Sequence, residues 1–209
     1  MLNRYAPVVH RYLLGAVRDA DAASDLFQEF ALRFLRGDFC GAEEKRGRYR
    51  DFLKGVLYHL IVDHHRRRSK SPIPLPERFD LAEDIDLEFS DGKQFVNDWR
   101  RELLSRSWNA LSDFEQQNAQ PWHALLQFRV SHGELRSAEL AAQFSQHLGK
   151  TVSADWVRQN LHRAREKFAA LLVDEVLQTL HQPTLEQLEL ELIDLEVIEY
   201  CRPVLKRMP

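Results

Sequence analysis

Two basic clusters contain the residue types best able to do chemistry in this sequence, and both suit contact with nucleic-acid phosphates. The first is H-H-R-R-R at 64–68, and the second is R-Q-N-L-H-R-A-R at 158–165. Arg neutralises phosphates, and both Arg and Gln can pair with base edges in a DNA groove. On helical spacing, Gln159, His162 and Arg163 point away from the apolar face of their stretch. The alternatives are a solvated helix end for the first cluster and a plain helical hairpin for the second.

The sequence offers little for catalysis. His59, Asp63, His64 and His65 could suggest a metal site, because His and carboxylate groups four residues apart share a helical face. No second ligand cluster accompanies them, and nothing resembles an activated nucleophile or a phosphate-binding loop. We therefore expect a protein that is not an enzyme and that uses no cofactor or metal.

Length and composition suit one or two small domains. The 209 residues have a net charge of −3, which argues against a generally basic surface, but the charges are unevenly distributed. Residues 43–70 are rich in cations, whereas 77–91 and 186–199 are acidic. Cys40 and Cys201 lack metal-ligand spacing. With no secretory signal and no long apolar run, we expect a cytoplasmic protein with reduced thiols and no membrane segment.

Helical periodicity predicts an all-α chain. The clearest pattern lies at 21–36, where apolar residues at helical spacing form one stripe. Asp21 is its expected N-cap, and Gly37 its expected left-handed C-terminal residue. Further helices are expected at 3–18, 48–68, 95–111, 121–128 and from Thr184.

Two adjacent stretches have the pattern of a helix-turn-helix. Ser137 is the expected cap of the first helix, which Gly149 would close, and Ser153 is the expected cap of the second. The second helix contains the basic cluster at 158–165 and could enter the major groove of DNA.

The face of 21–36 opposite the apolar stripe contains Leu32 among charged residues. A single exposed Leu is common on a solvated helix face, but Leu32 could also be the apolar centre of a protein-docking surface. The members of this face are Asp25, Gln28, Glu29, Leu32 and Arg36.

Three segments resemble extracytoplasmic-function (ECF) sigma factors, which are promoter-specificity subunits of bacterial RNA polymerase. D-L-F-Q-E-F-A-L-R-F-L at 25–35 resembles the region 2 signature D-x-x-Q-E-x-F-x-R-L-L. The segment at 46–68 is similar to regions 2.3 and 2.4, and W-V-R-Q-N-L-H-R-A-R-E-K-F at 156–168 is similar to region 4. The resemblance implies that the docking face on 21–36 binds the beta-prime clamp of core polymerase.

The same resemblance implies two sets of DNA contacts. The set for the minus-ten element is Arg46, Arg48, Arg50, His59, Arg66 and Arg67, to which helical spacing adds Lys54 and Tyr58 on the outer face, where Tyr58 could stack on an unpaired base. The set for the minus-thirty-five element is Arg158, Gln159, His162, Arg163 and Arg165. His59 stands where the family has asparagine, and the loop at 148–155 is longer than the family's, which indicates a divergent subgroup.

The implied organisation is a two-domain sigma factor. Region 2 would occupy 1–68, a Pro-rich and acidic linker 69–92, region 4 with its helix-turn-helix 93–182, and an acidic extension 183–209. The chain begins in the middle of region 2.1, which leaves room for a missing upstream helix. The implied partners are core polymerase, through the beta-prime clamp and the beta flap, and promoter DNA, with an anti-sigma factor as a further candidate.

Two alternatives remain open from the sequence. A stand-alone helix-turn-helix regulator would need no polymerase face at 25–36. The extension at 183–209 has two interpretations. It could fold back on the basic helix as a phosphate mimic, or its leucines could complete the core of the second domain, and we prefer the second interpretation. Those leucines are Leu185, Leu188, Leu192 and Leu195.

Overall fold

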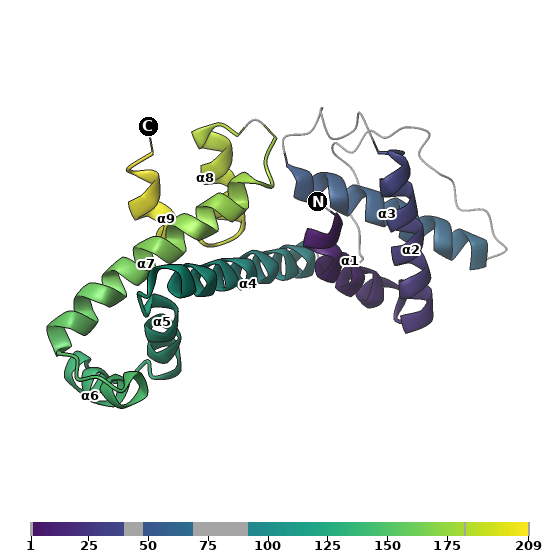
Figure 1. The fold of residues 1–209 in the computed structure, drawn as a ribbon. Helices are drawn as coiled ribbons and strands as arrows, with labels where there is room; N and C mark the ends of the chain where they lie inside the picture. The colour runs from purple at the N-terminus through teal and green to yellow at the C-terminus, as the bar shows by residue number, and fades with distance from the viewer. Residues whose placement is uncertain (1, 40–47, 69–91, 182, 209) are drawn as a thin grey trace. The chain divides into compact units, whose positions relative to one another are not determined.

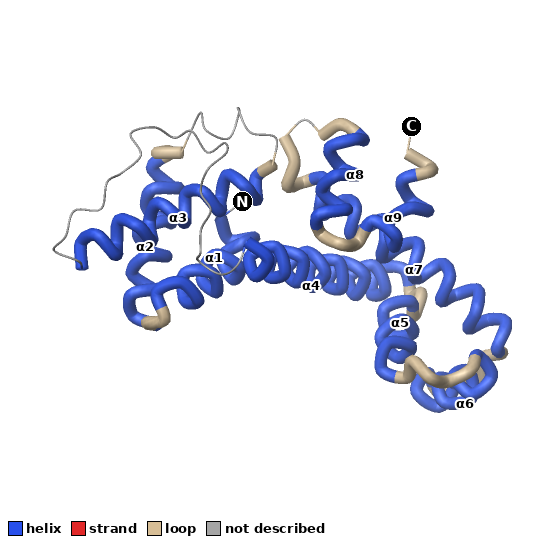
Figure 2. Tube along the Cα trace, turned by 180° about the vertical axis from the view of Figure 1, so that it is seen from behind, coloured by secondary structure: helices blue, strands red, loops and turns tan. Residues whose placement is uncertain are grey.

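The computed structural model describes residues 2–39, 48–68, 92–181 and 183–208 (Figure 1). Its elements are α1 (Leu2–Val17), α2 (Ala20–Arg36), α3 (Tyr49–Arg68), α4 (Gly92–Asn118), α5 (Trp122–Ser131), α6 (Ser137–Leu148), α7 (Ala154–Leu177), α8 (Leu185–Asp194) and α9 (Ile198–Leu205). This part of the chain contains no strand, so the predicted all-α class is confirmed for it (Figure 2). None of the described helices combines the length and apolar character of a membrane span. Arg46 and the predicted linker segment 69–91 lie outside the described residues.

The chain divides into two compact units, each made of two separate stretches. The first unit comprises Met1–Glu102 and Gln178–Leu190, and the second comprises Leu103–Leu177 and Glu191–Pro209. The division therefore falls inside α4 and inside α8, whereas the sequence placed domain boundaries at 93 and 183. Periodicity alone finds helices but does not show where one helix changes its packing partners.

In the first unit α1, α2 and α3 pack on one another, and aromatic side chains of α1 and α3 contact the start of α4. Trp99 is fully buried, and its ring stacks on that of Tyr5 with centroids 4.2 Å apart. Phe95 is also buried and meets Tyr12 edge to face at 5.0 Å. These aromatic contacts explain why the first part of α4 belongs to the unit that contains α1.

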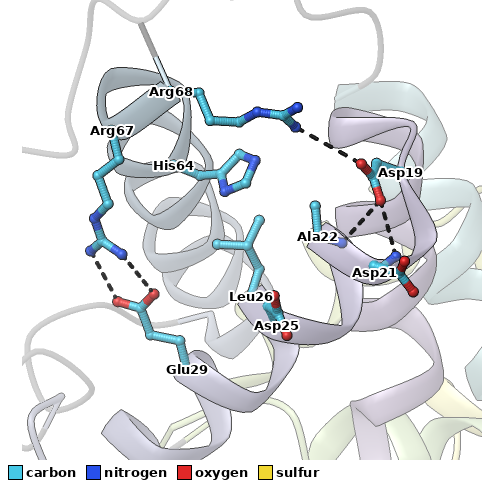
Figure 3. A pocket seen from close by; sticks show the side chains of 9 residues that line it. All are labelled: Asp19, Asp21, Ala22, Asp25, Leu26, Glu29, His64, Arg67 and Arg68. Carbon is cyan, nitrogen blue, oxygen red and sulfur yellow. Dashed lines mark hydrogen bonds and ion pairs between the residues drawn. The ribbon is translucent and has the colours of Figure 1, made fainter. Parts of the chain in front are cut away.

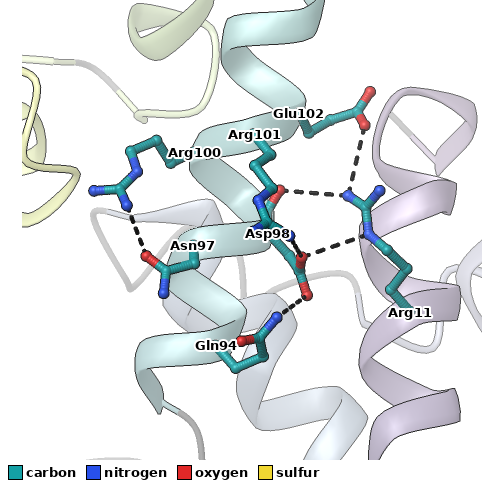
Figure 4. A network of polar contacts seen from close by, with 7 residues as sticks. All are labelled: Arg11, Gln94, Asn97, Asp98, Arg100, Arg101 and Glu102. Atoms are coloured by element: carbon teal, nitrogen blue, oxygen red, sulfur yellow. Dashed lines mark hydrogen bonds and ion pairs between the residues drawn. The ribbon is translucent and has the colours of Figure 1, made fainter.

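A polar network reinforces the same contact (Figure 4). The carboxylate of Asp98 is only 6% exposed, and it lies 3.7 Å from Arg11 Nε and 3.6 Å from Arg101 Nη1. Gln94 donates to its other oxygen at 3.3 Å. A buried carboxylate without partners would be costly, and these three side chains offset that cost. Among them, Arg11 is the one that joins α1 to α4.

The cap of α2 differs from the prediction. Asp19, in an extended conformation, accepts hydrogen bonds from the backbone N–H groups of Asp21 and Ala22, both at 3.1 Å. The prediction that Asp21 is the N-cap is wrong, because the helix begins at Ala20. Asp21 lies in the first turn, where the helix dipole favours an acidic side chain. Gly37 closes the helix at φ 77°, as predicted.

The second unit packs α5, α6 and α9 on α7. One apolar cluster joins Leu125 of α5, Phe144 of α6 and Leu161 of α7. Ser153 caps α7 as predicted, since its Oγ accepts the Trp156 N–H at 3.1 Å. Ser137 is not a cap: it is the first residue of α6, and there the Glu139 carboxylate accepts the Arg136 N–H at 2.9 Å.

The C-terminal extension forms α8 and α9 rather than a single helix. Thr184 and Gln187 make a reciprocal cap of α8, each accepting the other's backbone N–H at 3.2 Å. Its leucines are largely core residues, because Leu188, Leu192 and Leu195 are at most 1% exposed. The prediction of a second-domain core is wrong for Leu185, which is 45% exposed beside the cap, and for Leu188, which is buried but belongs to the first unit.

Candidate nucleic-acid interface

The helix pair α6–α7 has the construction of a helix-turn-helix. The apolar side chains of Leu140, Ala141 and Phe144 on α6 face Val157 and Leu161 on α7 in one buried cluster. Because these residues recur at steps of three and four, each helix has one face committed to the core and the other left to solvent.

Local hydrogen bonds fix the connection between the two helices. Gly149 adopts φ 66°, a left-handed conformation that favours glycine, and it ends α6. Ser145 Oγ donates to the Ala141 carbonyl at 2.6 Å and accepts the Val152 N–H at 2.9 Å. The loop that is longer than expected for the sigma family is therefore held to α6 by a side chain of that helix.

All five side chains predicted to read the minus-thirty-five element lie exposed on α7, namely Arg158, Gln159, His162, Arg163 and Arg165. Arg158 is paired with Asp155 one turn earlier. His162 Nε2 lies 3.6 Å from a Glu166 carboxylate oxygen. The surface is thus open to a ligand and contains both hydrogen-bonding groups and net positive charge.

A buried polar contact behind this surface was missed by the sequence reasoning. Asn160 is 6% exposed, and its Oδ1 accepts the indole N–H of Trp122 at 3.0 Å. Its amide donates to the Trp156 carbonyl at 2.9 Å. The sequence did contain a signal for this contact, because helical spacing places the polar Asn160 on the inward face of its helix. The contact ties α5 to α7 and so fixes the direction in which the exposed side chains point.

The predicted minus-ten residues of α3 are less uniformly exposed. Arg67 is exposed, whereas the other four predicted residues of the outer side are half-buried, namely Lys54, Tyr58, His59 and Arg66. The Tyr58 and His59 rings are 5.6 Å apart.

The start of α3 differs from this open end. Arg50 is only 4% exposed, because it shares the inward face of Leu53 and Leu57. Arg48 forms an isolated β-bridge with Leu180, and the Tyr49 N–H donates to the Thr179 carbonyl at 3.1 Å. Arg48 and Arg50 are therefore held in protein contacts in this structure, and Arg50 cannot reach DNA without a rearrangement.

A hollow of about 420 Å³ separates the start of α2 from the end of α3 (Figure 3). It brings together side chains that the sequence assigned to different partners, with Asp25 and Glu29 on α2 and Arg67 on α3. Arg67 reaches Glu29 with both terminal nitrogens at 3.3 Å. Arg68 Nη1 lies 3.9 Å from Asp19 at the same hollow.

The charges around this hollow alter the ionisation of two groups. Burial raises the pKa of Glu29, but hydrogen bonds and charges from Arg67 and Arg33 outweigh it, so the pKa is lowered overall. Burial lowers the pKa of His64, and the neighbouring His65, Arg68 and Arg67 lower it further. His64 is therefore neutral at pH 7, while Glu29 is charged and paired.

The predicted docking face of α2 is mostly open. Asp25, Gln28, Leu32 and Arg36 are exposed, and Leu32 is 54% exposed. Glu29 is half-buried because Arg33 and Arg67 cover it. The sequence reasoning missed Leu35, which is 75% exposed. The same spacing argument could have found it, since it lies one turn after Leu32.

No family model, curated protein or solved structure matches this chain. Within the described ranges, no group of three or more His, Cys, Asp or Glu side chains is placed to hold a metal ion.

Proposed function

We propose that the protein is a sigma factor of the ECF type, which directs bacterial RNA polymerase to specific promoters. The observation that carries the proposal is the first half of α7, where Arg158, Gln159, His162, Arg163 and Arg165 all face solvent while the opposite face of the helix is core. The second helix of a helix-turn-helix with that distribution suits the major groove.

Promoter reading by α7 follows from the chemistry of these groups. Gln159 can pair with adenine, and Arg163 with guanine, through two hydrogen bonds each. Arg158 is already paired with Asp155, so it suits a phosphate contact better than a base contact. The Asn160–Trp122 hydrogen bond holds the helix in place, which limits the loss of conformational entropy on binding.

Polymerase docking is assigned to the exposed face of α2. Leu32 and Leu35 lie one turn apart and expose large apolar side chains between polar neighbours. An apolar centre within a polar rim is the usual anatomy of a protein interface. This pair is also the observation that favours a sigma factor over a stand-alone helix-turn-helix regulator, which would have no use for it.

Contact with the minus-ten element is assigned to the outer side of α3. Tyr58 can stack on an unpaired base, and Arg66 and Arg67 can hold phosphates. In the isolated chain Arg67 is engaged by Glu29 of the docking face. When polymerase binds Glu29, Arg67 is released, so this pair links polymerase binding to DNA binding.

The proposal is tested by transcription from a promoter library with purified core polymerase. The chain should make the core initiate at a defined subset of promoters, and the selected minus-thirty-five sequence gives the cognate duplex. Gln159→Ala should weaken binding to that duplex by about 5–150-fold, corresponding to 1–3 kcal/mol, and should weaken a scrambled duplex less. Gln127→Ala, at an exposed glutamine of α5, is the matched control. Failure to initiate at any promoter would refute the proposal.

Polymerase docking is tested separately. Leu32→Glu should leave the helical content unchanged and weaken binding to core polymerase at least tenfold, because a charge would replace the apolar centre of the interface. Leu190→Glu, at an exposed leucine of α8, controls for the added charge. Equal affinities for the Leu32 variant and the unmodified chain would instead support the stand-alone regulator.

A further inference from the structure

The exposed face of α7 ends part-way along the helix. His162, Glu166, Ala169 and Val173 follow one another at steps of three and four, so they share a single face. The side chain of His162 is 74% exposed, whereas Ala169 and Val173 are each 2% exposed. The face that begins as a ligand-accessible surface is therefore covered one turn after Glu166.

Helix α9 covers this continuation. Tyr200 donates its hydroxyl to the Arg165 carbonyl at 3.2 Å, and its ring meets Phe168 edge to face at 5.8 Å. Cys201 and Leu205 are buried in the same unit. Figures 1 and 2 both show α9 beside the second half of α7. The contacts place α9 where the open face ends.

The end of α9 brings two cations to this boundary. Arg207 Nη2 lies 2.7 Å from the Oε1 atom of Glu166, and His162 Nε2 lies 3.6 Å from the same oxygen. Lys206 is exposed at the C-terminal end of α9, and 69% of the Arg207 side chain is exposed. Arg207 thus offsets the negative charge of Glu166 beside His162, and Lys206 adds a positive charge next to it.

We propose that Lys206 and Arg207 form a second DNA contact, made to the phosphate backbone beside the groove that α7 enters. A helix with its side chains is about 10–12 Å across and fills a major groove about 12 Å wide, so an element packed on its groove-facing side must meet the flanking backbone. At that place α9 presents cations. The inference rests on the proposed function, because it requires α7 to enter the groove.

Phosphate contacts have a signature that needs no knowledge of the promoter. Each contact steepens the dependence of log K on log salt by about 0.9, whatever the base sequence. The probe is a fluorescent 24-bp duplex of mixed sequence, titrated with the full chain between 50 and 200 mM salt. Lys206→Gln should lower the magnitude of the slope by about 0.9. The ratio of the unmodified chain's affinity to the variant's affinity should therefore fall about 3.5-fold between the lowest and the highest salt concentration. Lys93→Gln, at an exposed lysine of α4 in the first unit, should leave the slope unchanged.

The contribution of Arg207 is tested in a variant that lacks Glu166, because Arg207→Gln alone would leave the negative charge of Glu166 unpaired by Arg207. Glu166→Gln/Arg207→Gln is therefore compared with Glu166→Gln, and the slope should again fall by about 0.9. Far-ultraviolet circular dichroism checks that each variant is folded. Unchanged slopes in both comparisons, or tighter binding by the Lys206 variant, would overturn the inference. Absence of any duplex binding by the unmodified chain would instead count against the proposed function of α7.

Discussion

Leu192 and Leu190 offer a direct test of whether the C-terminal extension is part of the folded core. Both lie on α8, two residues apart, yet Leu192 is fully buried while Leu190 is 45% exposed. Replacing a fully buried Leu by Ala removes buried methyl groups and leaves a cavity, at a cost of about 2–5 kcal/mol. The same change at an exposed position of a helix costs roughly 0.5 kcal/mol or less, since Ala is itself a good helix former.

Thermal unfolding followed by circular dichroism is the assay. For a chain of this size, 1 kcal/mol shifts the melting temperature by about 2–4 °C, so Leu192→Ala should lower it by roughly 4–20 °C. Leu190→Ala should lower it by roughly 2 °C or less. Equal shifts for the two variants would refute the argument that α8 buries one face and exposes the other.

Truncation after Gln182 extends the test to the whole extension. Since it removes the buried Leu188, Leu192, Leu195 and Leu205, the melting temperature and the affinity for DNA should fall together. An extension that acted as an inhibitory phosphate mimic would give the opposite sign, with DNA binding strengthened on truncation and the gain largest at low salt. That outcome would contradict the core assignment.

Three further predictions concern single side chains. Trp122→Phe removes the donor to the buried Asn160 amide oxygen, so the free energy of unfolding measured with urea should fall by about 1–3 kcal/mol. In a Cys40→Ser background, Cys201 should react with a thiol reagent only as fast as the chain opens, because it is fully buried and burial raises its pKa to about 11. A rate at pH 8 equal to that of a free thiol would refute this. Because the pKa of Glu29 is lower in the folded chain than in the unfolded chain, its ionisation stabilises the fold at any pH above the unfolded-state pKa. This stabilisation is lost as the pH falls through the folded-state pKa. Glu29→Gln should therefore show a smaller loss of stability between about pH 5 and 3 than the unmodified chain.

Features set by one residue and its local backbone could be predicted from the sequence. Gly37 and Gly149 end helices at positive φ because glycine adopts that conformation readily, and Ser153 caps α7 because its short side chain reaches the first turn. The N-cap of α2 was predicted wrongly, because Asp19 and Asp21 have the same side chain and both can cap a helix. Only the residue at which α2 begins decides between them.

Features set by distant partners could not be predicted. Periodicity predicted a helix at 95–111 but not that Trp99 within it belongs to the first unit, since its partner Tyr5 lies far away in sequence. The exposure of the α7 residues followed from helical spacing, whereas the packing of α9 on the same helix had no local signal. The burial of Arg50 was missed because the resemblance treated it as a DNA contact, although its spacing from Leu53 and Leu57 places it inward.

The pairing of Arg48 and Tyr49 with Leu180 and Thr179 affects how the chain is made. At roughly 5–20 residues per second, on the order of ten seconds pass on the ribosome between the synthesis of the two segments. During that interval α1 to α3 lack the segment Gln178–Leu190 that completes their unit. The N-terminal part therefore cannot finish folding first, as N-terminal domains usually do. Both units need residues that follow α7, so a ribosome that stalls within α7 holds a chain in which neither unit is finished.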